Sequence, residues 1–178
     1  MSGERIRVTT PFSDGAIKSL AAGDALSISG VLYTARDAAH KRLAEMASSG
    51  MKMPFEFDGA AVYYAGPTPA RPGAAIGSAG PTTSGRMDAY SPTLMALGLR
   101  VMIGKGSRNA DVKRAIIEHC GLYLAATGGA AALIARSVKS SEVIAFPDLG
   151  TEAIRRLVVE NFPAIVAIDS AGRDVYER

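Results

Sequence analysis

Strand-like and helix-like hydrophobic patterns follow one another along most of the chain. Alternating apolar positions rich in β-branched residues predict strands, whereas apolar residues that recur every three or four positions predict amphipathic helices. On this basis we expect strands at 5–10, 25–34, 60–65, 99–103, 122–126 and 143–146, and helices at 16–20, 36–49, 87–97, 110–119 and 130–135. An α/β fold with a mixed sheet accounts for this order.

The end of the chain carries a pattern typical of a β-hairpin. Residues 157–159 and 164–168 are apolar, and Asn161-Phe-Pro163 separates them. Asn and Pro are frequent in turns, so we expect the two segments to pair across this tripeptide. The sequence contains neither an internal repeat nor a low-complexity linker, and residues 1–178 are therefore expected to form one domain.

Composition narrows the class of protein. A chain of 178 residues with 48% hydrophobic and 21% charged residues is typical of a globular protein that buries a core without disulfides. No apolar run approaches the roughly 20 residues of a membrane-spanning helix, and no secretory signal is visible, so we expect a cytoplasmic protein with no membrane partner. The net charge of +3 is spread along the chain, which indicates no nucleic-acid partner.

Cys120 is the only cysteine in the sequence. An internal disulfide is therefore excluded, and a zinc or iron–sulfur site that needs several cysteine ligands cannot be completed by this chain. We accordingly expect no metal bound by this chain alone.

The run Gly80-Pro-Thr-Thr-Ser-Gly-Arg-Met-Asp88 is the best candidate for a binding site. Helical periodicity follows it, so its hydroxyls and backbone N–H groups should gather at a helix N-terminus, where the helix dipole favours anions. Arg86 adds a guanidinium, which binds carboxylate or phosphate through two parallel hydrogen bonds. Spacing alone equally allows Thr83 or Ser84 to be a simple N-cap and Arg86 a solvated surface charge.

Glycines mark two further candidate positions, one after a predicted strand and one before a predicted helix. Lys105 stands between glycines directly after the strand at 99–103, where ligands commonly bind in α/β sheets, although it also fits an exposed loop lysine. The spacing of a P-loop is absent around it. Gly128-Gly129 would permit either the close approach of a ligand or tight strand-to-helix packing.

Arg36 and His40 open the helix expected after the strand at 25–34. Residues four positions apart share one face of a helix, so both side chains are candidates to face a cleft. A single histidine is more often structural than catalytic, and the spacing does not distinguish the two roles.

Taken together, these motifs resemble the β subunit, or C-terminal domain, of class I fumarases and L-tartrate dehydratases. The resemblance rests on the Gly80–Asp88 run, on Arg36-Asp-Ala-Ala-His40, on Gly104-Lys-Gly106 and on Phe162-Pro-Ala164, and it extends over nearly the whole chain. It implies that the α/β domain has the swivelling β/β/α fold of that family.

The same resemblance implies roles for individual residues. Arg36, Arg86 and Lys105 match positions that hold the dicarboxylate substrate, and Thr82 matches the proposed catalytic base; His40 and Thr83 are further candidates. A hydroxyl ordinarily holds its proton too tightly at neutral pH to act as a base. Thr82 would need a neighbouring base or a cationic field, and the sequence does not show one.

A cofactor and a partner follow from the resemblance as well. Such proteins use a [4Fe-4S] cluster held by three cysteines of the α subunit or N-terminal domain, and this chain supplies no such cysteines. The chain would then act with a cluster-bearing α subunit in a hetero-oligomer. The implied reaction is reversible hydration, in which iron acts as Lewis acid on the hydroxyl and a base takes the proton from the adjacent carbon.

Fumarate hydration to L-malate is expected ahead of L(+)-tartrate dehydration. Two other classes of function stay open. The same residues would suit a binding module for small carboxylates or phosphates that performs no chemistry. A purely structural assembly subunit is the other alternative.

Overall fold

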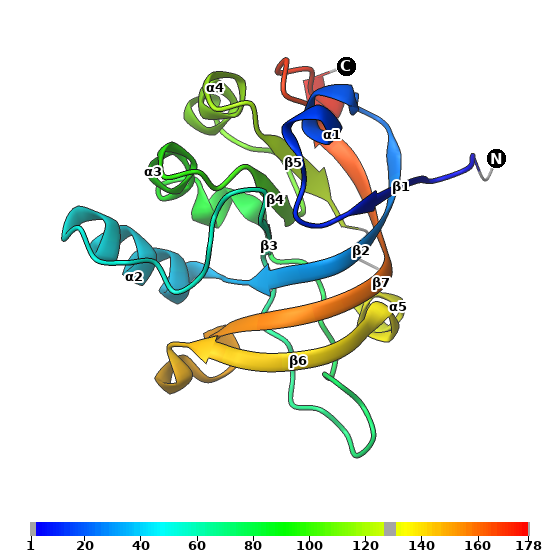
Figure 1. Cartoon of the computed structure of the whole chain (residues 1–178), viewed down its shortest axis with the longest axis vertical. Coiled ribbons are helices and arrows are strands. Elements are labelled where there is room, and N and C mark those ends of the chain that lie inside the picture. The colour runs from blue at the N-terminus through cyan, green and yellow to red at the C-terminus, as the bar shows by residue number, and fades with distance from the viewer. Residues whose placement is uncertain (1–2, 127–130, 178) are drawn as a thin grey trace.

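The computed structural model describes residues 3–126 and 131–177, and within them seven strands form one mixed sheet (Figure 1). The strands are β1 (Ile6–Thr9), β2 (Ala25–Thr34), β3 (Ala61–Tyr63), β4 (Val101–Gly104), β5 (Leu122–Ala125), β6 (Val138–Ala145) and β7 (Ile154–Ile168). The α-helices are α1 (Asp14–Ser19), α2 (Asp37–Ser48), α3 (Ser91–Ala96), α4 (Ala110–Glu118) and α5 (Ala131–Ser137), and short 3₁₀ helices are η1 (Ser84–Met87), η3 (Pro147–Glu152) and η4 (Val175–Glu177). The predicted α/β fold with a mixed sheet is confirmed.

Strand pairing closes most of the sheet into a ring. Strands β1 to β5 are parallel neighbours in chain order, and β7 runs antiparallel to both β5 and β2. The pairings from β2 through β3, β4, β5 and β7 therefore return to β2, while β1 and β6 lie at edges. Most backbone groups of the ring strands are paired, which gives a rigid frame for the loops at the strand ends.

Two hydrophobic clusters lie on the two faces of this ring. Successive side chains of a strand point to opposite faces, and Tyr63 and Tyr64 accordingly belong to different clusters. The first cluster takes alternate residues from all the ring strands. The second packs the other face against Leu43 of α2, Leu94 of α3 and Ile116 of α4, three helices that lie together on one side of the sheet (Figure 1).

Several predicted elements are confirmed with nearly the expected bounds. The strand predicted at 25–34 is β2, and the helix predicted at 36–49 is α2. Gly50 follows α2 with a φ of 67°, a left-handed conformation that glycine adopts without strain and that ends helices. Asn109 caps α4, because its side chain accepts the Val112 N–H at 2.9 Å.

The predicted C-terminal hairpin is wrong. A single strand, β7, runs from Ile154 to Ile168 through the expected turn. Asn161 adopts a left-handed backbone (φ 54°), and its N–H donates to the Ser29 hydroxyl at 3.1 Å. Residues of β2 pair with β7 on both sides of this position, with a register shift beside Gly30. The turn-forming residues therefore make a β-bulge instead of a turn.

The helix predicted at 87–97 is shorter than expected. The 3₁₀ helix η1 occupies Ser84–Met87, and α3 begins only at Ser91. Pro92 stands in the first turn of α3, where its missing N–H leaves no hydrogen bond unmade. In a helix that began at 87, the same proline would lie in the interior and break it.

Two further predictions differ in extent. The strand predicted at 143–146 is the longer β6, and the helix predicted at 130–135 is observed as α5. Ala130 and Gly128-Gly129 lie outside the described residues. Among the helices that are described, none has the length and apolar character to cross a membrane.

Candidate functional site

The candidate residues follow parallel strands that end at one edge of the sheet. Arg36 lies just after β2, Tyr64 after β3 and Lys105 after β4. These strands are adjacent and parallel, so their carboxyl ends meet at the same edge. Loops converge there, which is why this edge is the usual ligand site of α/β sheets.

Asp37 brings Arg36 and Arg86 together. Arg86 donates from Nε to Oδ1 of Asp37 (2.8 Å), and Nε of Arg36 lies 3.8 Å from Oδ2 of the same carboxylate. Glu152 places a second carboxylate oxygen 3.8 Å from Nε of Arg36. The side chain of Arg86 is 53% exposed, whereas that of Arg36 is 25% exposed and its Nε is buried without a hydrogen-bond partner among the described residues.

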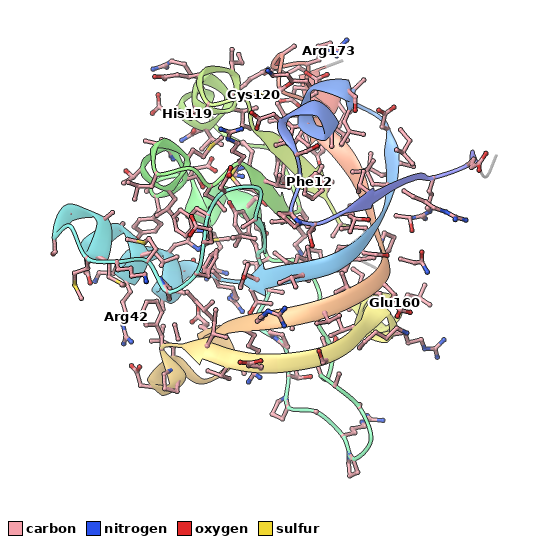
Figure 2. All side chains as sticks on the ribbon, viewed as in Figure 1. Phe12, Arg42, His119, Cys120, Glu160 and Arg173 are labelled. Carbon is pink, nitrogen blue, oxygen red and sulfur yellow. The ribbon has the colours of Figure 1, made fainter. Side chains whose placement is uncertain are left out.

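The N-terminal part of α2 is held in place by η3 and its flanking residues. Arg42 of α2 donates to Asp148 (Nη1 to Oδ1, 2.8 Å), and its guanidinium carbon lies 5.1 Å from the centre of the Phe146 ring (Figure 2). Glu152 accepts the N–H of Ala38 at 3.4 Å. These contacts fix the helix end that carries Arg36.

The Gly80–Asp88 run passes between the ends of β3 and β4. The N–H of Thr82 donates to the Tyr64 carbonyl (2.6 Å), and the N–H of Ser84 donates to the Lys105 carbonyl (2.9 Å). Thr83 and Lys105 form a parallel β-bridge. Backbone pairing therefore brings Thr82 and Thr83 beside Lys105.

The predicted anion cradle at a helix N-terminus is wrong. The run leads into η1, which has only four residues, and α3 begins beyond it. The N-cap alternative is not observed either, since Thr83 makes no side-chain capping bond and Ser84 is buried with its hydroxyl 2.8 Å from that of Tyr123. Arg86 is paired with Asp37 instead of being a free surface charge. The run therefore lacks a long helix whose dipole would favour an anion.

His40 lies beneath the site and does not face a cleft. Its side chain is buried, and Nδ1 donates to the Arg36 carbonyl at 2.8 Å, because a carbonyl can only accept. The ring meets the Tyr64 ring edge-on, with centroids 5.1 Å apart. Burial lowers the pKa of His40 from 6.5 to about 4, so the ring is neutral at pH 7. Within the described residues, Nε2 has no hydrogen-bond partner.

A buried ion pair under the site was not expected from the sequence. Arg108 donates from Nε to Oδ1 of Asp88 (2.6 Å), and both side chains are at most 10% exposed. Asp88 ends the Gly80–Asp88 run, and Arg108 lies two residues after Gly104-Lys-Gly106. The pattern of residue types gives no sign that these two charges are buried together.

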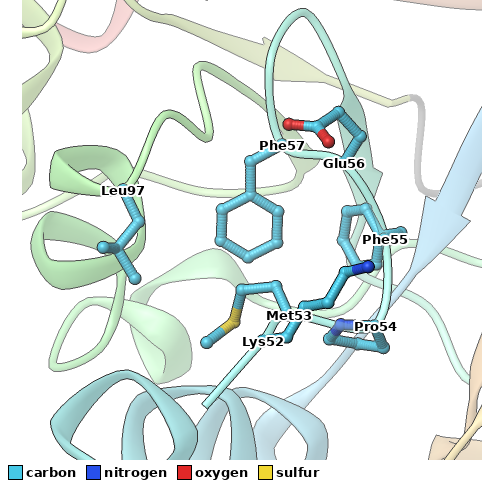
Figure 3. Close-up of a pocket in the computed structure, with 7 residues that line it drawn as sticks. All are labelled: Lys52, Met53, Pro54, Phe55, Glu56, Phe57 and Leu97. Carbon is cyan, nitrogen blue, oxygen red and sulfur yellow. The ribbon is translucent and has the colours of Figure 1, made fainter. Parts of the chain in front are cut away.

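A cavity of about 420 Å³ lies apart from these residues (Figure 3). Its lining comes from the segment 52–57 and from Leu97 at the end of α3. Phe57, Met53 and Leu97 point into the same space. Lys52 and Glu56 are its charged lining residues, and a single cation beside a carboxylate does not suit a dicarboxylate.

The edge that carries Arg36, Arg86 and Lys105 suits a small dianion, because guanidinium groups bind carboxylates through paired hydrogen bonds. In residues 3–126 and 131–177, no group of three or more His, Cys, Asp or Glu side chains is placed to hold a metal ion. Fold and site together define an α/β domain with two arginines and a lysine at one edge of its sheet.

Comparison with known proteins identifies the family. The family model described as Fumarase C-terminus matches residues 2–178. The chain is 42% identical over 155 residues to the aerobic class I fumarate hydratase of Escherichia coli K12, and 40% identical over 158 residues to fumarate hydratase 2 of Leishmania major. The chain belongs to the Fumarase C-terminus family, and the resemblance noted in the sequence is confirmed.

The relatives differ in how much of their length is matched. The alignments cover 86% and 88% of this chain but only 28% of the Escherichia coli and Leishmania major proteins. A Methanocaldococcus jannaschii protein that carries the provisional name L(+)-tartrate dehydratase subunit beta is 40% identical over 167 residues, which are 90% of this chain and 86% of that protein. The chain thus spans about a quarter of the fumarate hydratases and nearly all of the subunit.

Proposed function

We propose that the chain is the β subunit, or C-terminal part, of a hydro-lyase that interconverts fumarate and L-malate. The observation that carries the proposal is the grouping of Arg36, Arg86 and Lys105 at one edge of the sheet in a member of the Fumarase C-terminus family. Fumarate and malate are dianions, which this charge complements. The relatives named fumarate hydratase support the choice of substrate.

In this proposal the basic residues bind and orient the substrate. Arg36 and Arg86 each bind a carboxylate, and Lys105 adds a point charge. With both carboxylates held, the reacting carbons have a fixed position relative to the base. The same cations offset the negative charge that grows as the proton leaves carbon.

Thr82 is the proposed base that takes this proton. Its backbone N–H is bound to the Tyr64 carbonyl, which fixes the residue at the end of β3. Arg86 and Lys105 lie on neighbouring segments, and nearby positive charge favours the deprotonated hydroxyl. Thr83, exposed beside Lys105, is a second hydroxyl that can bind a substrate carboxylate. His40 is buried and neutral, so we assign it a structural role.

The proposal assigns the [4Fe-4S] cluster to an α subunit. This chain does not fit it as ligand, because Cys120 is the sole cysteine of the sequence and the described part offers no group of metal-binding side chains. The unmatched length of the fumarate hydratases leaves room for the cluster-bearing part. The proposal further includes an α–β hetero-oligomer and the swivelling β/β/α fold for this chain. It places the protein in the cytoplasm, since the free thiol of Cys120 suits a reducing compartment.

L(+)-tartrate dehydration is the second candidate activity. It is favoured by the Methanocaldococcus jannaschii relative, which this chain matches over nearly its full length as a separate subunit. Tartrate and malate carry the same two carboxylates, so the same basic residues would bind either one. Residues of the α subunit would then distinguish their hydroxyl groups.

Production of the chain together with its cluster-bearing α subunit, followed by anaerobic assay, tests the activity. We expect hydration of fumarate and dehydration of malate only when both chains are present. Absence of activity with malate, tartrate and their methylated relatives, in a complex with a loaded cluster, would contradict the proposal.

Calorimetry on the isolated chain separates the proposal from a binding module. A split site predicts weak malate binding to the chain alone and tighter binding to the complex. A dissociation constant of about 1 μM for the isolated chain, unchanged by the α subunit, would favour a binding module that needs no partner.

A further inference from the structure

The guanidinium of Arg108 is enclosed by polar and aromatic groups. Its side chain is 0% exposed; Nε donates to Asp88 (2.6 Å), and Nη2 donates to the Ser91 hydroxyl (2.8 Å). The ring centres of Tyr64 and Tyr123 lie 5.4 and 4.9 Å from its central carbon. Burial opposes the charged form, but Tyr64 and Asp88 outweigh it and raise the pKa of Arg108 above its ordinary value. The group is therefore a permanent buried cation.

Asp88 connects Arg108 to two loops of the candidate site. It ends the Gly80–Asp88 run, which carries Thr82 and Arg86. Its Oδ1 accepts from Arg108, and its Oδ2 accepts the N–H of Asn109 at 2.8 Å, at the start of α4. Both carboxylate oxygens thus hold the run against the loop between β4 and α4, which begins with Lys105.

Tyr64 and Tyr123 extend the same contacts to the strand ends. The Tyr64 carbonyl accepts the Thr82 N–H, while its ring packs on Arg108. The Tyr123 hydroxyl donates to the Gly106 carbonyl at 2.7 Å, next to Lys105. Groups that surround the buried guanidinium therefore bind the backbone at Thr82 and at Gly106, which follows Lys105.

A buried ion pair is weak support for a role in stability. Removing two charges from water offsets much of their attraction, and apolar residues of similar volume often stabilise a fold equally well. A charge-assisted hydrogen bond is short and directional, however, and fixes the relative position of the segments that it joins. Removing the pair is therefore expected to disturb the relative position of the two segments that it joins.

We propose that Arg108 is a positioning residue, which through Asp88 fixes the Gly80–Asp88 run relative to the Lys105 loop. Arg108 itself lies below the surface and does not touch the substrate. The catalytic consequence rests on the proposed function, whereas the positioning of the two loops does not.

Amide hydrogen exchange on the isolated chain tests the positioning independently of any activity. In Arg108→Met we expect exchange at 80–88 and 105–109 to accelerate about tenfold or more, while strands β4 and β5 keep their protection. Arg108→Lys keeps the charge and should restore part of the protection. The double variant Arg108→Met/Asp88→Leu replaces the pair by apolar residues; its unfolding temperature should return toward that of the wild type, but exchange in both loops should stay fast.

Arg173→Met is the control for loss of an arginine–aspartate pair elsewhere in the fold, at an arginine whose side chain is 67% exposed. Arg173 also donates from Nε to a buried aspartate, Asp169, at the same 2.6 Å, and it lies near the C-terminal end (Figure 2). Asp169 binds the backbone of Ala22 and Ala171 instead of the site loops. We expect Arg173→Met to leave exchange at 80–88 and 105–109 unchanged.

Kinetics of the assembled enzyme provide the second measurement. We expect kcat to fall on the order of 100-fold in Arg108→Met and in the double variant, with a smaller change in KM, because misplacement of the base and the clamping residues affects the chemical step most. Arg108→Lys should recover part of kcat. Wild-type loop exchange and wild-type kcat in the double variant would overturn the proposal. An inactive wild-type complex would refute the proposed function alone, and loop exchange would then decide the role of Arg108.

Discussion

Single charges determine what the candidate site can bind. Asp37 accepts a hydrogen bond from Arg86 and lies beside Arg36, so it orients both guanidinium groups and offsets part of their charge. A ligand with one carboxylate has to compete with Asp37 for a single arginine. Under the proposed function, a dicarboxylate would engage both arginines at once, which would favour dianions at this edge.

Arg86→Ala tests the carboxylate clamp. We expect kcat/KM for malate to fall on the order of 100-fold or more, because one charged hydrogen-bond donor to the substrate is lost. Assembly with the α subunit should stay intact, and size-exclusion chromatography of the complex checks it. Arg114→Ala is the control, since Arg114 is 71% exposed on α4 and pairs only within its own helix. An unchanged kcat/KM in Arg86→Ala would remove Arg86 from the site.

His40 makes stability depend on pH. The unfolded chain binds a proton at His40 below about pH 6.5, whereas the folded chain does so only near pH 4, because burial lowers the pKa. The neutral His40 ring therefore makes its full contribution to the free energy of unfolding above about pH 6.5. This contribution declines as the pH falls toward 4, by about 2 kcal/mol between pH 7 and pH 5. The charge of Arg108 acts in the same direction as burial, while the Arg36 carbonyl and the charge of Asp37 oppose it.

Urea denaturation at pH 7 and pH 5 measures this effect. The wild type should lose more unfolding free energy than His40→Gln on going to pH 5. His119→Gln, at the end of α4, should behave like the wild type. Identical pH dependence in the wild type and His40→Gln would contradict the assignment.

At the level of elements, the Gly80–Asp88 run depends on close packing against the end of β4. A Cβ added at Gly104 would collide with the Ser84 hydroxyl and lie 2.9 Å from a ring carbon of Tyr64. Ser84 cannot easily move, because its hydroxyl contacts Tyr123 and its N–H donates to the Lys105 carbonyl. The absence of a side chain at Gly104 therefore lets the run lie directly on the strand.

Gly104→Ala should separate the run from β4. We expect the free energy of unfolding to fall by about 1–3 kcal/mol, as in other overpacked sites, together with a higher KM in the assembled enzyme. Thermal and urea unfolding of the isolated chain measure the first effect. Gly85→Ala is the control in the same run, since a Cβ there meets no atom within 4 Å. Equal stability of the two variants would show that the packing is not required.

At the scale of the whole molecule, the ring of strands supports the loops that carry the site. Phe162 of β7 is fully buried, and its ring lies edge-on to Tyr63 of β3 with centroids 5.1 Å apart. The contact joins strands from distant parts of the sequence. The candidate site lies on the surface of this frame, which leaves it open to an α subunit.

Phe162→Ala should destabilise the whole fold. We expect a loss of about 3–5 kcal/mol in the free energy of unfolding, because a large cavity opens in the core. Ile165→Ala on the same strand is the control and should cost about 1 kcal/mol, since Ile165 is 42% exposed. Urea denaturation of the isolated chain compares them, and similar losses in both variants would place Phe162 outside the core.

The hydrophobic pattern predicts helices and strands well where burial of one face is the dominant cause of the element. Alternation over 25–34 predicts β2, and helical spacing after Arg36 predicts α2, because in each the buried side chains repeat with the period of the element. The pattern fails at Asn161, where turn-forming residues lie inside β7. Pairing of β2 on both sides of that residue outweighs its local preference.

Some features of this protein follow from local sequence, and others depend on contacts between segments that are far apart in the chain. Composition, periodicity and motif spacing are enough to predict the α/β class, the family, the residue types that suit a dicarboxylate and the lack of cysteines for a cluster. Three features become visible in the folded chain alone: Asp37 joins Arg36 to Arg86, His40 is buried, and Arg108 and Asp88 form a pair beneath the site. Such contacts join segments far apart in the chain, and strand pairing, not local pattern, brings them together.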